Sequence, residues 1–139
     1  MKYLTRISIL CLFFGVFSCG KVTSEKTVSV EINLLNNSES TITLSSIVCP
    51  SNSVEFYPPE IILPPHKEWH ITKRVSNYSV ICICPTSLII SNGDSSVHQS
   101  IDSPANGICN QDNFIRISTK NSSSFTFTIT DSLLTDWFK

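Results

Sequence analysis

A strict alternation of apolar and polar side chains is the feature that most constrains how this chain folds. In VSVEINL, residues 28–34, every second side chain is apolar, and the same pattern returns in SFTFTIT, residues 124–130. Successive side chains of a β-strand point to opposite faces of the sheet, so this period is that of a strand with one buried face. The chain is therefore predicted to form sheets that share a core.

Further short apolar runs, separated by proline, asparagine and glycine, predict additional strands. They are TITLSSIV (41–48), VEFY (54–57), EIIL (60–63), KEWHIT (67–72), YSVICIC (78–84), LII (88–90), FIRIS (114–118) and, within the loop-like segment 93–113, a short edge strand at 97–101. We expect 28–34 and 41–48 to pair as a hairpin around the turn at Asn36. The most apolar run, 78–84, is expected to be a central strand, and 60–63, between two proline pairs, an edge strand.

The C-terminal part combines a hairpin with a helix. FIRIS and SFTFTIT are predicted to pair around Lys120-Asn121, and DSLLTDWFK then changes to helical spacing, with Thr130 or Asp131 as the N-cap. Seven to nine short strands without βαβ alternation predict an all-β fold, an antiparallel immunoglobulin-like β-sandwich with a short C-terminal helix. We expect a single domain over residues 28–139.

Charge composition argues against one class of partner. Without residues 1–18, which carry Lys2 and Arg6, the 139-residue chain holds 8 basic and 11 acidic side chains, a balance of −3. Proteins that bind nucleic acid neutralise phosphates with a basic face. Nucleic acid is therefore not an expected partner.

Four of the six cysteines lie in the predicted domain: Cys49, Cys82, Cys84 and Cys109. An even number in an exported domain predicts two disulfides. The CxC spacing of Cys82 and Cys84 is too tight for a zinc site, and a bond between them would close a strained ring. We expect these two to bond with Cys49 and Cys109, in an order that the sequence leaves open. A redox role is disfavoured because the CxC pair lies in a run with the character of a buried strand.

The N-terminus has the three parts of a secretory signal peptide. MKYLTR is basic, ISILCLFFGVF (7–17) is apolar and uncharged, and small and polar residues follow. The eleven residues of the apolar run are too few to cross a bilayer, which needs about 20. Residues 1–18 are therefore predicted to be a signal peptide that is removed.

The end of this leader allows two cleavage sites. Val16, Ser18 and Cys19 resemble the lipobox of bacterial lipoproteins, although Phe17 stands where a small or β-branched residue is usual. Cleavage before Cys19 would leave a cysteine that receives acyl chains, followed by a polar tether at 19–27. Cleavage after Gly20 is the alternative, and it would discard Cys19 and release a soluble secreted protein.

Three further segments, together with VFSC at the end of the leader, carry a resemblance to a family. They are VEINLLNNSESTIT (30–43), IILPPHKEWHI (61–71) and FTFTITD (125–131). Their order resembles that of small uncharacterised β-sandwich lipoproteins of Bacteroidetes-type bacteria. The resemblance implies a cell-envelope location, at the outer membrane or cell surface, with acylated Cys19 in the lipid bilayer. Two or more acyl chains hold a protein stably on a membrane, whereas one does so only marginally.

Sequence motifs for catalysis are missing. The chain has no GxSxG, HExxH, Walker or GxGxxG motif, so we expect neither enzymatic activity nor a cofactor. His66 and His70 share a predicted strand face, but two histidines without a third ligand are a weak metal site. A metal-dependent hydrolase is therefore a remote alternative, and we expect no metal.

The sequence as a whole predicts a non-catalytic, lipid-anchored envelope protein that binds or supports an unknown protein or glycan partner. A soluble secreted, disulfide-bonded binding protein is the alternative. An aromatic binding patch is the less favoured reading of Phe56, Tyr57, Trp69 and Tyr78, which we expect to fill the core and its rim.

Overall fold

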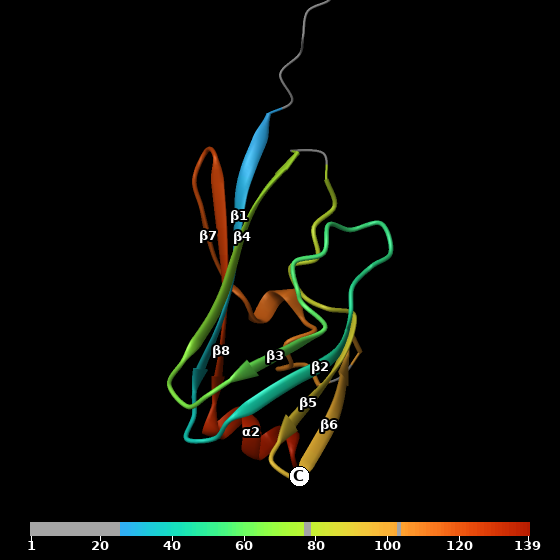
Figure 1. The fold of residues 1–139 in the computed structure, drawn as a ribbon, viewed down its shortest axis with the longest axis vertical. Coiled ribbons are helices and arrows are strands. Elements are labelled where there is room, and N and C mark those ends of the chain that lie inside the picture. Colours follow the sequence, from blue (N-terminus) through green and yellow to red (C-terminus); the bar gives the residue numbers. More distant parts are fainter. Residues whose placement is uncertain (1–25, 77–78, 103) are drawn as a thin grey trace, which may run out of the picture.

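The computed structural model describes residues 26–76, 79–102 and 104–139 and contains two four-stranded sheets packed face to face (Figure 1). The strand orders are β4-β1-β8-β7 in the first sheet and β3-β2-β5-β6 in the second. The described elements are β1 (Thr27–Asn37), β2 (Ile42–Val48), β3 (Glu60–Leu63), β4 (Glu68–Ser76), β5 (Ser87–Asn92), β6 (Ser95–Ser100), η1 (Gln111–Asn113), β7 (Ile115–Ser118), β8 (Ser122–Thr130) and α2 (Asp131–Trp137). The predicted all-β sandwich with a short C-terminal helix is confirmed.

The alternating runs form the centre of the first sheet. Ile32 of β1 lies between Ile71 of β4 and Phe125 of β8. The side chains that β1 and β8 turn inward are nearly free of solvent contact: Val30, Ile32, Leu34, Phe125, Phe127 and Ile129. Burying one such side chain contributes roughly 1.5–3 kcal/mol to stability, so this layer is a main source of the folding free energy.

β1 and β8 run parallel, whereas all other neighbouring strands are antiparallel. A parallel pair needs a long connection between its strands. Here the connection is almost the whole domain, because β1 opens the described fold and β8 is its last strand. The prediction of an entirely antiparallel sandwich is wrong for this pair.

β1 and β2 do not form the predicted hairpin, because the chain changes sheets at Asn36. The Asn36 side chain is fully buried, and its amide nitrogen donates to the carbonyl oxygens of Ser40 at 2.8 Å and of Leu63 and Pro64 at 2.9 Å. Its amide oxygen accepts hydrogen bonds from the backbone nitrogen and hydroxyl of Ser38, at 3.1 and 2.6 Å. Asn36 therefore ties the β1–β2 corner to the end of β3.

The run 78–84, predicted as a central strand, is not a strand over its described residues, 79–84. Within them Ile81 makes a β-bridge, to Val54, and Val80 is 53% exposed. The segment 54–57, also predicted as a strand, makes no more than this bridge. Both segments lie as irregular loops beside the upper half of the first sheet in Figure 1.

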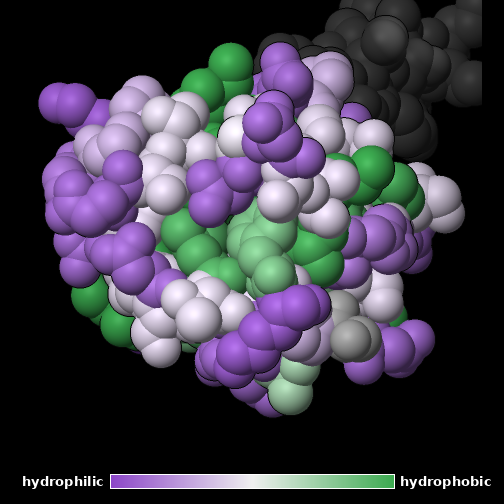
Figure 2. Space-filling model, turned by 90° about the horizontal axis from the view of Figure 1, so that it is seen from below, coloured by the Kyte–Doolittle hydropathy of each residue, from purple (hydrophilic) through white to green (hydrophobic). Residues whose placement is uncertain are grey.

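The remaining local predictions are confirmed. β7 and β8 form a hairpin, β3 is an edge strand, and β6 is an edge strand within the loop-like segment. Thr130 caps α2, with its hydroxyl oxygen accepting a hydrogen bond from the Leu133 nitrogen at 3.3 Å. Leu134 and Trp137 of α2 are buried, so the helix closes the lower end of the sandwich. Figure 2 views this end, where hydrophilic side chains surround a small hydrophobic area.

Candidate functional site

A disulfide joins Cys49 to Cys82, with the two Cα atoms 5.8 Å apart. It links the segment after β2 to the segment before β5, beside the bridge between Val54 and Ile81. The prediction of disulfide bonding is confirmed for this pair. The structure also chooses between the two orders that the sequence left open, because Cys82 bonds with Cys49.

Cys84 and Cys109 are free thiols in this structure and pack against the same core. Burial raises the pKa of both thiols. The charge of Cys84 adds to the effect of burial on Cys109, whose pKa rises to about 12. Neither thiol therefore has the low pKa that activates a cysteine for nucleophilic attack.

Tyr57 lies against the backbone of the segment that carries Cys82 and Cys84. Its hydroxyl donates to the carbonyl oxygen of Ile83, and its ring stacks on Trp69 with the ring centroids 5.7 Å apart. Burial raises the pKa of Tyr57, and the charges of Cys84 and Cys109 raise it further. The Tyr57 hydroxyl is thus a neutral donor that holds the CxC segment against the first sheet.

The aromatic residues of the sequence prediction pack in the core and at its rim where the structure describes them. Phe56 is 2% exposed and Tyr57 is 9% exposed, whereas Trp69 is half-buried against them. The fourth residue, Tyr78, lies outside the described residues. The described three are better placed to stabilise the fold than to form a binding patch.

A hollow of about 280 Å³ lies between the irregular segment 79–83 and the inner face of the first sheet. It is lined by Val28, Val30, Val75, Ser76, Ser79, Ile81, Ile83, Arg116, Ser123 and Phe125. The Arg116 guanidinium lies 5.5 Å from the centre of the Phe125 ring and donates to the Ser118 hydroxyl at 2.8 Å. The lining combines apolar side chains, three serines and one positive charge.

The two histidines of the predicted sequence pair do not share a site. His66, in the β3–β4 connection, lies with its Nε2 atom 3.2 Å from Glu39 Oε1, whereas His70 lies on β4 opposite Asn33. Within the described ranges, no group of three or more His, Cys, Asp and Glu side chains is placed to hold a metal ion.

The sequence does not predict the hollow, because the run 78–84, which contributes Ile81 and Ile83 to its lining, is predicted to be a strand within a sheet. Pro50, Pro58 and Pro85 flank the two irregular segments. Proline is unfavourable within a central strand because it cannot donate to its neighbour. Prolines also flank β3, which is a strand, so flanking prolines alone do not distinguish a segment that covers a sheet from an edge strand.

Cys19, the predicted lipidation site, and the predicted leader at 1–18 lie outside the described residues. Over the part of the chain that the structure covers, no helix has the length and apolar character needed to cross a membrane. No protein-family model, curated protein or solved structure matches this chain.

Proposed function

We propose that this protein is a non-catalytic, lipid-anchored component of the cell envelope that binds or supports a protein or glycan partner. The observation that carries the proposal is the order of features along the chain. A basic and apolar leader ends in VFSC, polar residues follow, and β1 begins at Thr27. This is the order of a lipoprotein whose folded domain follows a short tether.

The place where the chain enters the fold supports this function. β1 begins at the upper end of the sandwich in Figure 1, so acyl chains on Cys19 would hold this end toward the bilayer. Thr27 is eight residues from Cys19, a distance of at most about 29 Å for a fully extended chain. The opposite end, with α2 and the β5–β6 turn, would then face away from the membrane toward a partner.

We also propose that the architecture is immunoglobulin-like. Two packed four-stranded sheets support this assignment, and β2 lies beside β5 as the second strand lies beside the fifth in immunoglobulin domains. The position of β1 differs from that of a constant-type domain, since β1 lies in the sheet opposite β2.

An exported location also bears on the two thiols, and we propose that Cys84 and Cys109 form a second disulfide in the envelope. Both pack against the same core, and Cys49 and Cys82 are already joined to each other. Forming the bond releases two thiol protons and passes two electrons to the disulfide of an exchange partner, such as a thiol–disulfide oxidoreductase, which is reduced to a dithiol.

The intact mass of the protein from its native host, together with partitioning between aqueous and detergent phases, tests the anchor. We expect a chain that begins at Cys19, carries the mass of acyl chains and enters the detergent phase. Cys19→Ser should abolish acylation and detergent partitioning. Cys11→Ser, a matched change within the leader, should preserve both. A chain that begins after Gly20 without added mass would replace this proposal with the secreted alternative.

A further inference from the structure

We propose that the end of the sandwich at which β1 begins is a membrane-facing surface that binds anionic lipid headgroups and so orients the domain on the bilayer. The inference rests on the proposed anchor at Cys19 for its location. It adds a surface, a partner chemistry and an orientation that the anchor alone does not give.

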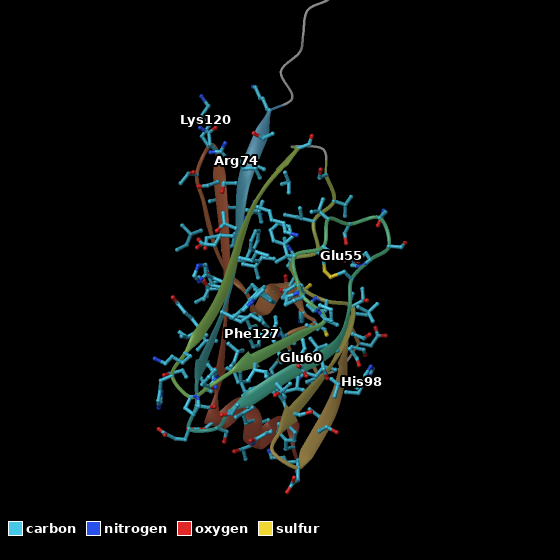
Figure 3. All side chains as sticks on the ribbon, in the orientation of Figure 1. Glu55, Glu60, Arg74, His98, Lys120 and Phe127 are labelled. Carbon is cyan, nitrogen blue, oxygen red and sulfur yellow. A yellow bond between two sulfur atoms is a disulfide. The ribbon has the colours of Figure 1, made fainter. Side chains whose placement is uncertain are left out.

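Cations gather at this end of the first sheet, which we call the basic end: Lys26, Lys73, Arg74 and Lys120. Arg74 of β4 lies opposite Ser29 of β1, and the Ser29 nitrogen donates at 3.0 Å to the carbonyl oxygen of Asn121, next to Lys120 in the β7–β8 turn. Figure 3 shows Arg74 and Lys120 together at the upper end of the molecule. Cations of β4 and of the β7–β8 turn thus flank the start of β1.

Three of these cations are available to a partner. Lys26, Arg74 and Lys120 are exposed, and none of them pairs with a carboxylate of the described residues. Lys73 is engaged, because its Nζ atom donates to the backbone carbonyl of Glu55 at 2.5 Å. The acidic neighbours of this surface are Glu31, two residues beyond Ser29 on β1, and the exposed Glu55. Positive charge therefore prevails at the basic end.

The opposite end has the reverse balance. Its carboxylates come from the β1–β2 corner, the start of β4, the β5–β6 turn and α2: Glu39, Glu68, Asp94, Asp131 and Asp136. Lys67 and Lys139 also lie there, and Lys139 is paired with Asp136 at 2.6 Å. This is the end that Figure 2 shows, and many of its side chains are hydrophilic. Charge is therefore separated along the long axis, with the positive end where the tether enters.

This separation favours one orientation on an anionic surface. The net charge of the predicted mature chain is −3, so the protein as a whole is not attracted, and only the basic end can approach such a surface favourably. Screening limits the attraction to about 8 Å at physiological ionic strength, a separation that the tether permits. Each Lys or Arg close to an anionic leaflet strengthens binding by about fivefold.

Vesicle binding by an unacylated chain tests the inference. The mature chain 19–139 with Cys19→Ser is mixed with vesicles of phosphatidylcholine alone or with one third phosphatidylglycerol. We expect binding to the anionic vesicles that is lost at high salt. The double variant Arg74→Gln/Lys120→Gln should bind about 30-fold more weakly, the product of two such contributions.

The matched control is Lys67→Gln/Lys139→Gln, which changes the same charge at the opposite end and should leave vesicle binding unaltered. All four side chains are exposed, so thermal unfolding of both variants should equal that of the parent chain. Equal binding to neutral and anionic vesicles, or equal losses in the two variants, would overturn the inference. Release by millimolar glycerol phosphate would also overturn it, by assigning the affinity to free phosphate instead of a lipid surface.

The anchor and the surface are tested separately. Acylated Cys19 in the native protein without a preference for anionic vesicles overturns the orienting surface alone. A native chain that lacks Cys19 and still binds anionic vesicles through Arg74 and Lys120 overturns the anchor alone.

Discussion

The two ends of the sandwich are closed in different ways. At the lower end, strands of both sheets reach the end of the sandwich. The Asn36 side chain holds the connection from β1 to β2, which passes from one sheet to the other, and α2 covers the end of the core. At the upper end the first sheet extends beyond the second, and the irregular segments 49–59 and 79–86 lie beside it. A disulfide, one β-bridge and the hydrogen bond from Tyr57 hold these segments.

This difference shows what each kind of closure requires. Strands and a capped helix satisfy their backbone groups internally and pack at the density of a protein interior. The irregular segments leave a hollow of about 280 Å³ against the first sheet, and a covalent link helps to hold them. Regions with few regular hydrogen bonds open at a lower free energy than core strands, so we expect local opening to begin at the upper end.

The largest expected effect is at the lower end, on removal of the Asn36 side chain. Asn36→Ala leaves the Ser38 hydroxyl and the carbonyls of Leu63 and Pro64 without this partner in a buried site. Each buried group left unpaired costs about 1–3 kcal/mol, so the free energy of unfolding should fall by about 4 kcal/mol in urea denaturation.

The control for this variant is Asn33→Ala. Asn33 lies on the same strand, but its side chain is only half-buried and donates to the Ser124 hydroxyl at 3.0 Å. We expect a loss of about 1 kcal/mol for this control. If Asn36→Ala and Asn33→Ala cost the same, the buried hydrogen bonds do not hold the corner, and the lower end is closed by apolar packing.

At the upper end, the corresponding test removes the disulfide. Cys49→Ala/Cys82→Ala opens a loop with a sequence separation of 33 residues, and the chain-entropy model predicts a loss of about 3–4 kcal/mol. Hydrogen exchange should accelerate first at residues 79–83, with a smaller effect on the amides of β8. Cys84→Ala is the control for loss of a cysteine without loss of this link. Uniform acceleration over the whole domain would contradict independent opening of the upper end.

The sequence predicted the parts of the fold that local patterns determine. The runs of alternating apolar and polar residues correctly predicted β1, β8 and the buried face of each, because this alternation depends only on the residues of the one strand. The Thr130 cap and the helical spacing after it gave α2 for the same reason. The partners of β1 are not a local property, since Ser29 lies beside Ser122 from the other end of the domain.

The wrong predictions concern sequence patterns that are compatible with two different structures. Asn36 stands at the end of a strand, where a hairpin turn is expected. Its side chain instead donates a hydrogen bond to the Leu63 carbonyl oxygen of the second sheet, and the chain continues into that sheet. The apolar run 78–84 has the composition of a strand, yet its described residues cover a sheet without joining one. An even number of cysteines predicted disulfides but not their order, because pairing depends on distances in the fold. The acylation of Cys19 stays a prediction.

The smallest expected effect concerns Cys109 and tells whether one or two covalent links hold the upper half. A free Cys109 thiol has a pKa of about 12 in the folded protein and an ordinary value of 9.0. The unfolded chain therefore loses the proton first as the pH rises. The thiol has no effect on stability below pH 9, and the free energy of unfolding falls between pH 9 and 12, by about 1.4 kcal/mol at pH 10.

Urea denaturation at pH 8 and pH 10 measures this loss. Cys84→Ala forces Cys109 to remain a thiol, whereas Cys84→Ala/Cys109→Ala removes it and leaves all other titrating groups in place. The first variant should lose more stability than the second between the two pH values, by at most about 1.4 kcal/mol, because Cys84→Ala also removes the charge that adds to the rise in the Cys109 pKa. Oxidised parent protein should behave like the double variant, because a Cys84–Cys109 disulfide has no thiol to titrate. If the parent protein instead follows Cys84→Ala, a single disulfide holds the irregular segments, and the contrast between the two ends is greater than we propose.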